Sequence, residues 1–157
     1  MRRATRAVMT LAAAGVMGVA SAGAAQASAY GASPIQPFSY TTSAGAAKSV
    51  PYGCALVHSV IGEGTNITAQ TASVDCAGWA AMRDGLFCDV RVSFVFTDTA
   101  GRSTDPVSQT LSGCRTLGIR LSNPDMPVDV EPGRACVKLY VNGEKTARAT
   151  SCHVISS

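Results

Sequence analysis

Aromatic residues make up only 6% of this 157-residue chain, and one of them is its single tryptophan. A hydrophobic core must therefore be built mainly from Val, Leu, Ile and Ala. Histidine is equally scarce, with only His58 and His153, and neither lies in a nucleophile or zinc-protease motif. His58 alternates in phase with apolar residues, which indicates a structural histidine in a strand. These absences favour a binding protein over an enzyme.

Two further kinds of site are also missing from the sequence. The cysteines lack the C-x-x-C spacing of zinc and redox sites, so we expect no metal and no cofactor. Asp129 and Glu131 are the closest carboxylates in sequence, and they alternate onto one face of an extended stretch beside Pro132. A glycosidase would need its two carboxylates across a cleft, which this spacing does not indicate.

The N-terminus has the pattern of a secretion signal. Arg2, Arg3 and Arg6 precede an Ala-rich apolar run, and Ala27-Ser28-Ala29 matches a signal-peptidase site. We therefore predict a signal peptide over residues 1–29 and a secreted, extracellular protein beginning at Tyr30. The chain has 13 Lys and Arg against 10 Asp and Glu, so removing the three signal arginines leaves ten of each. A net charge of zero disfavours nucleic acid or an anionic membrane as a partner.

Six cysteines follow the predicted signal, and in a secreted chain they predict three disulfides. The cysteines are Cys54, Cys76, Cys88, Cys114, Cys136 and Cys152. Each bridge would stabilise the fold by about 2–4 kcal/mol. Six cysteines allow about 15 connectivities, of which we favour pairing in sequential order.

From Cys54 onward the residue pattern is that of β-strands. Residues 54–76 are rich in Val, Ile and Thr and turn near residues 63–66, and residues 88–96 alternate apolar with polar side chains. The expected fold is all-β, a small disulfide-bonded β-sandwich of Ig-like or Greek-key type over residues 54–157. Residues 77–85 are the one predicted helix, and we expect Trp79 within it to pack over the end of the sheet.

The register of the last two hairpins stays open. A symmetric hairpin would place Cys88 opposite Cys114, but it would also turn Ser108, Thr110 and Ser112 toward the apolar face. A two-residue turn at Asn142-Gly143 would leave Cys152 three residues out of register with Cys136, so their bridge requires a bulge or a longer loop.

Residues 30–53 differ in composition from the remainder of the chain. Lys48 is their only charge, they contain three prolines, and Ile35, Phe38 and Tyr40 are spaced through a Ser/Thr/Ala/Gly background. We predict an extended N-terminal tail whose three apolar side chains enter a groove or sheet edge of a partner. The alternative is a spacer between the signal and the domain.

An Ala-rich signal, a neutral tail and a six-cysteine β domain together make a recognisable plan. In this plan the chain resembles the small secreted linker subunits of the umbrella-shaped antibacterial toxin particles of filamentous actinobacteria. The resemblance implies a non-catalytic adaptor that joins a lectin-bearing subunit to the stalk of a large toxin polypeptide. The tail would bind one of these partners and the domain the other.

Two other functions compete with the adaptor. In a serine-protease inhibitor, a bridged Cys114 would hold Arg115 and Thr116 extended for insertion into the primary pocket of a trypsin-like enzyme. In a carbohydrate-binding or cell-wall module, Trp79 and Tyr140 are the candidate aromatic pair.

Overall fold

A computed structural model describes residues 28–157 of the protein, and the predicted signal peptide lies almost entirely outside these residues. The strands are β1 (Ala29–Pro34), β2 (Phe38–Thr41), β3 (Ala47–Val50), β4 (Cys54–Glu63), β5 (Asn66–Cys76), β6 (Phe87–Asp98), β7 (Val107–Arg115), β8 (Ile119–Ser122), β9 (Val128–Asp129), β10 (Gly133–Tyr140) and β11 (Ala149–Ile155). A single helical turn, α1 (Gly78–Ala81), follows β5. The predicted all-β class is confirmed.

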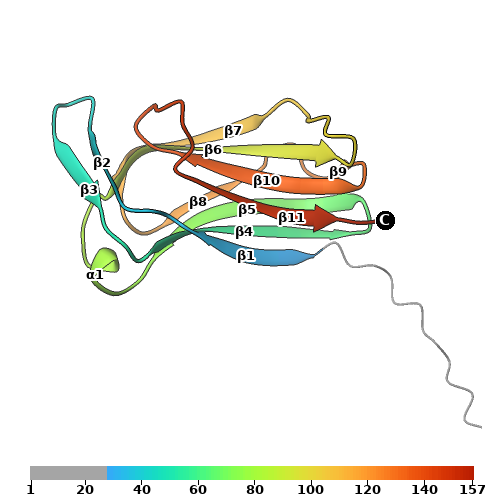
Figure 1. Ribbon diagram of the computed structural model, residues 1–157, viewed down its shortest axis with the longest axis horizontal. Coiled ribbons are helices and arrows are strands. Elements are labelled where there is room, and N and C mark those ends of the chain that lie inside the picture. The colour runs from blue at the N-terminus through green and yellow to red at the C-terminus, as the bar shows by residue number, and fades with distance from the viewer. Residues whose placement is uncertain (1–27) are drawn as a thin grey trace, which may run out of the picture.

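The strands form two layers and a small hairpin (Figure 1). One sheet has the order β1-β4-β5-β8, with β9 also paired to β5, and the other has the order β11-β10-β6-β7. After the β6–β7 hairpin the chain crosses to β8 and returns as β10 beside β6, which is a Greek-key connection. The third unit, β2 paired with β3, lies at the same end of the molecule as α1 (Figure 1).

The core lies between the two sheets and follows from the alternation of side chains along each strand. In β6, Val90, Val92 and Phe94 are each 1% exposed, and Val137 and Leu139 of β10 are fully buried beside them. Residues of one parity thus face the opposite sheet, as the pattern over residues 88–96 predicts. Removing such side chains from water is the main favourable contribution to folding.

All three disulfides join sequential cysteines, as expected. The pairs are Cys54–Cys76, Cys88–Cys114 and Cys136–Cys152, and each pair occupies directly opposed positions of an antiparallel ladder. Among residues 28–157 no cysteine is free. The bonds thus link neighbouring strands within a sheet.

A β-bulge resolves the conflict at Cys88. Asp89 has a positive φ of 48°, and its side chain accepts a hydrogen bond from the backbone N–H of Gly113 at 2.9 Å. The register then shifts by one residue, so that Val90 is opposite Leu111 and Phe94 is opposite Val107. Because side chains in a strand alternate, this shift turns the apolar residues of β7 inward while the bridge is kept.

The Cys136–Cys152 bridge is accommodated by a longer loop, so the two-residue turn at Asn142-Gly143 is wrong. The ladder between β10 and β11 ends at Leu139 opposite Ala149, and the intervening residues form an open loop. Asn142 has φ 54°, and its side chain donates to the backbone oxygen of Thr41 in β2 at 2.7 Å. The asparagine therefore ties the loop to the β2–β3 hairpin.

The prediction of a free tail over residues 30–53 is wrong, because this segment is part of the fold. β1 pairs with β4 along its whole length, from Ala29 opposite Val60 to Pro34 opposite Ala55. Ile35 is 1% exposed and Tyr40 is 8% exposed, both within the main core, and Phe38 packs against that core. The three apolar side chains therefore complete the protein's own interior, and the domain begins before Cys54.

The predicted helix shrinks to one turn, and Trp79 does not pack over the sheet. Its side chain is 68% exposed, while Ala80 beside it is buried. Among residues 28–157 no helix is long enough and apolar enough to cross a membrane.

Candidate protein-binding surfaces

Large apolar side chains are exposed at the α1 end of the sandwich. Three segments meet there, namely the turn before β4, the α1 region and the turn between β7 and β8. We define the α1-end patch as Tyr52, Trp79, Met82 and Leu117, whose exposed fractions are 76%, 68%, 71% and 61%. Single exposed apolar residues are common on proteins, but a group of them rimmed by polar residues marks an interaction surface.

Backbone hydrogen bonds hold these three segments together. Ala77 donates its N–H to the backbone oxygen of Gly53 at 2.8 Å, which joins the α1 region to the turn that carries Tyr52. The hydroxyl of Thr116, which is 5% exposed, donates to the backbone oxygen of Arg83 and accepts from the N–H of Leu86 at 3.0 Å. The patch is therefore presented on a fixed backbone, which lowers the entropy lost on binding.

Tyr40 fixes the start of β6, which follows the α1 region. Its hydroxyl donates to the backbone oxygen of Leu86 at 3.0 Å and accepts from the N–H of Cys88 at 2.9 Å. Burial raises the pKa of Tyr40, while the Cys88 hydrogen bond opposes that shift. The residue predicted to bind a partner instead positions the loop that leads into β6.

The candidate inhibitor segment is only partly presented to solvent. Cys114 is bridged to Cys88, and Arg115 is exposed, but Arg115 lies in β7 opposite Phe87. Thr116 is buried by the two hydrogen bonds described above. Cys114, Arg115 and Thr116 therefore do not form the protruding extended loop that a protease would require.

The candidate carbohydrate pair is not an aromatic platform. Tyr140 is half-buried, and the guanidinium of Arg91 covers its ring at 3.8 Å from the centroid. Among residues 28–157, the aromatic contacts involve Phe38, Tyr40, Phe87 and the two histidines, and none joins Trp79 to Tyr140.

His58 belongs to a buried polar cluster between the sheets. Its side chain is fully buried, and its Nε2 lies 3.1 Å from Nε2 of Gln70, whose Oε1 accepts from Asn123 at 3.1 Å. The ring of His153 stacks on it with centroids 4.7 Å apart. Burial, and then the nearby His153, lower the pKa of His58 from 6.5 to about 3, against an opposing effect of the Ser151 backbone. His58 is thus the structural residue that its alternation predicts.

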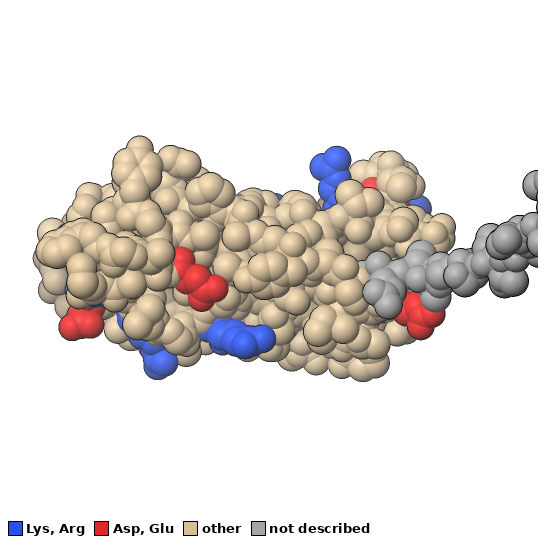
Figure 2. Space-filling model, turned by 90° about the horizontal axis from the view of Figure 1, so that it is seen from below, with Lys and Arg blue, Asp and Glu red and all other residues tan. Residues whose placement is uncertain are grey.

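Charge is distributed unevenly over the molecule. The segment from Ser28 to Met82, which includes β1, β4 and β5, contains only Lys48, Glu63 and Asp75 as formally charged residues. Figure 2, seen from the side on which β1 and β4 lie in Figure 1, accordingly shows few charged side chains. The cores of protein interfaces are likewise depleted in charge.

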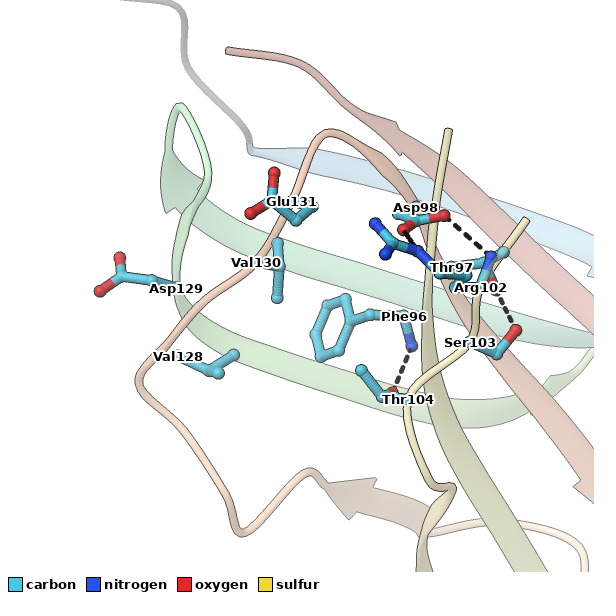
Figure 3. Close-up of a pocket in the computed structure, with 10 residues that line it drawn as sticks. All are labelled: Phe96, Thr97, Asp98, Arg102, Ser103, Thr104, Val128, Asp129, Val130 and Glu131. Atoms are coloured by element: carbon cyan, nitrogen blue, oxygen red, sulfur yellow. Dashed lines mark hydrogen bonds and ion pairs between the residues drawn. The ribbon is translucent and has the colours of Figure 1, made fainter. Parts of the chain in front are cut away.

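At the opposite end from α1, beside β9, the structure has a pocket of about 330 Å³ that sequence reasoning missed (Figure 3). Phe96, Val128 and Val130 are its apolar lining residues, and its charged lining residues are Asp98, Arg102, Asp129 and Glu131. We call it the β9-end pocket. The only signal in the sequence was the alternation of Asp129 and Glu131, and nothing there places Phe96 and Asp98 beside them.

One carboxylate of this pocket already binds a guanidinium. Nε of Arg102 donates to Oδ2 of Asp98 at 2.6 Å, and the backbone N–H of Arg102 donates to Oδ1 at 2.8 Å. The backbone hydrogen bond from Arg102, with further help from its side chain, lowers the pKa of Asp98. Asp129 accepts from Nδ2 of Asn66 at 2.7 Å.

These features define a disulfide-bonded all-β sandwich with a rigid apolar patch at one end and an acidic pocket at the other. Comparisons of the chain with known protein families, with curated proteins and with solved structures give no match. Three disulfides suggest that the protein resides in an oxidising environment.

Proposed function

We propose that this protein is a secreted, non-enzymatic adaptor that binds other secreted proteins, and that the α1-end patch is one of its docking surfaces. The observation that carries the proposal is the exposure of Tyr52, Trp79, Met82 and Leu117 on three segments fixed to one another by hydrogen bonds. Trp and Tyr are enriched among the residues that dominate binding energy at protein interfaces.

The composition of the patch fits a protein partner. A buried Trp contributes about 150–250 Å² of contact area, and truncating such a residue at an interface costs about 2 kcal/mol or more. Arg83 follows α1 and Arg115 ends β7 next to the turn that carries Leu117, and both are exposed, which supplies polar groups for the rim. The resemblance to toxin-particle linkers suggests the partners: a lectin-type subunit and a large toxin polypeptide.

Residues 30–53 are not a partner-binding tail in this proposal, because Ile35, Phe38 and Tyr40 pack in the core of the protein itself. Binding instead uses surfaces of the folded domain. The adaptor thus engages its partners as a rigid body, and binding requires no ordering of a flexible segment.

The test is a pull-down from culture supernatant with tagged protein, followed by mass spectrometry of the co-purifying proteins. We expect the double variant Trp79→Ala, Leu117→Ala to lose at least one companion by tenfold or more. Val154→Ala is the matched control, since Val154 is 74% exposed but lies in β11 outside the patch. An unchanged set of companions in the double variant would remove the patch from the mechanism, and capture on insoluble cell-wall glycan without protein companions would favour the carbohydrate-binding alternative.

A further inference from the structure

The zero net charge of residues 30–157 conceals a separation of charge along the molecule. The β9 end comprises residues 63–66, 98–106 and 123–134, which are the β4–β5 turn, the end of β6 with its connection to β7, and the segment that runs from the end of β8 through β9 into β10. The β4–β5 turn, the end of β6 and β9 lie at one end of the molecule in Figure 1. Its charged residues are Glu63, Asp98, Arg102, Asp105, Asp125, Asp129, Glu131 and Arg134. Six acids against two arginines give this end a formal charge of −4, which the remaining four acids and eight bases offset with +4.

The β9-end pocket lies within this acidic end and has an apolar interior. Figure 3 shows the ring of Phe96 directed toward Val128 and Val130, with Glu131 next to Val130. The carboxylate of Glu131 is exposed and takes part in no ion pair among residues 28–157. The pocket therefore joins an aromatic ring, aliphatic walls and a solvent-accessible carboxylate.

We infer that the β9-end pocket binds an arginine side chain presented by a partner protein. The aliphatic stem of an arginine packs against apolar side chains while its charged head stays at a polar rim. Its planar guanidinium stacks on an aromatic ring and donates paired hydrogen bonds to a carboxylate, which an ammonium cannot reproduce. Arg102 of this chain, itself a lining residue, donates Nε of its guanidinium to Asp98, which leaves Glu131 as the carboxylate for an incoming arginine.

Charge complementarity favours an arginine side chain in this pocket over an acidic or a neutral side chain. An approaching cation experiences the field of the whole −4 end as well as the pocket carboxylates, which accelerates association and favours basic segments. The inference deepens the proposed adaptor function, on which it rests, by assigning the chemistry of a second partner at the end opposite the α1-end patch.

Fluorescence anisotropy on the purified protein, with its three disulfides intact, tests the inference. The probes are labelled peptides of alternating Gly and Arg, the same peptide with Lys, and the same peptide with Glu. We expect the Arg peptide to bind at least threefold more tightly than the Lys peptide, and the Glu peptide not to bind. Glu131→Gln should weaken the Arg peptide at least fivefold.

Glu63→Gln is the matched control, because it removes the same charge from the same end outside the pocket. It should change affinity by less than twofold. Equal losses in the two variants, or no binding of the Arg peptide at 20 mM salt, would overturn the pocket as the site. If the natural protein sediments as a dimer and Glu131→Gln sediments as a monomer, the pocket binds a second copy of this chain. That result would overturn the inference that a partner protein supplies the arginine. If these tests fail while the Trp79 and Leu117 double variant still loses its companions, the adaptor proposal stands without the pocket.

Discussion

Acidification should destabilise this protein through one buried histidine. His58 is fully buried, and its neutral Nε2 accepts the hydrogen bond that Nε2 of Gln70 donates. Protonation would place two donors 3.1 Å apart and bury a charge beside the ring of His153. The folded protein therefore resists protonation of His58, whereas the unfolded chain does not.

The magnitude follows from the difference in pKa between the two states. The folded pKa of about 3 lies below the unfolded value of 6.5, so the unfolded state binds more protons between these values. Above pH 6.5, His58 is neutral in both states and the free energy of unfolding keeps its full value. As the pH falls from 6.5 toward 3, the free energy of unfolding decreases by about 1.4 kcal/mol per pH unit. At pH 4.5 the loss reaches about 2.7 kcal/mol, a large share of a typical total of about 5–15 kcal/mol.

Urea unfolding followed by far-UV circular dichroism at pH 7 and pH 4.5 measures this loss. His58→Gln keeps a polar side chain without a titrating ring. Between pH 7 and pH 4.5, the free energy of unfolding of this variant should therefore decrease by about 2–3 kcal/mol less than that of the natural protein. His153→Gln is the control, and we expect it to retain most of the pH dependence. Equal pH dependence of the natural protein and His58→Gln would refute the reasoning.

Three further predictions concern the hairpin, the sheet and the inhibitor alternative. Tyr40→Phe should lower stability by about 1.5–3 kcal/mol in thermal unfolding, because it removes both hydrogen bonds at Leu86 and Cys88, whereas the exposed Ser39→Ala should have little effect. Gly133→Ala should cost about 3 kcal/mol or more, since its new Cβ would lie 2.0 Å from the backbone oxygen of Thr97, while Gly101→Ala, where space is open but φ is +82°, should cost about 1–2 kcal/mol. Trypsin titrated with an equimolar amount of the protein should keep its activity, because Arg115 is held in β7 and Thr116 is buried.

Much of the sheet could be predicted from the sequence because its signals are local. Alternation along residues 88–96 predicts β6 and its buried face, and the Val, Ile and Thr content of residues 54–76, with a turn near residues 63–66, predicts the first hairpin. The Cys88–Cys114 hairpin shows a feature that local sequence signals do not predict. The conflict between the bridge and the apolar face was visible, but the bulge at Asp89 that removes it depends on one positive φ and a side-chain contact with Gly113.

Residues 30–53 show a different limit. The interpretation of the spacing of Ile35, Phe38 and Tyr40 as a partner-binding pattern is wrong, because composition alone does not say which apolar surface such side chains contact. In the fold the partner is the chain itself, because a core poor in aromatics gains Phe38 and Tyr40 beside Phe87. β1 also covers the edge of β4, which would otherwise be open to unwanted pairing.

The folded position of this segment changes the mode of partner binding that we propose. A captured peptide would bind with a large entropic cost, whereas two rigid surfaces at opposite ends lose little freedom on binding. The two surfaces also differ physically. Binding at the α1-end patch would depend on apolar burial and change little with salt, while binding at the −4 end would weaken as salt screens the charges. Under the adaptor proposal, rising ionic strength should therefore release one partner before the other, and the partner released first should be the one that Glu131→Gln weakens.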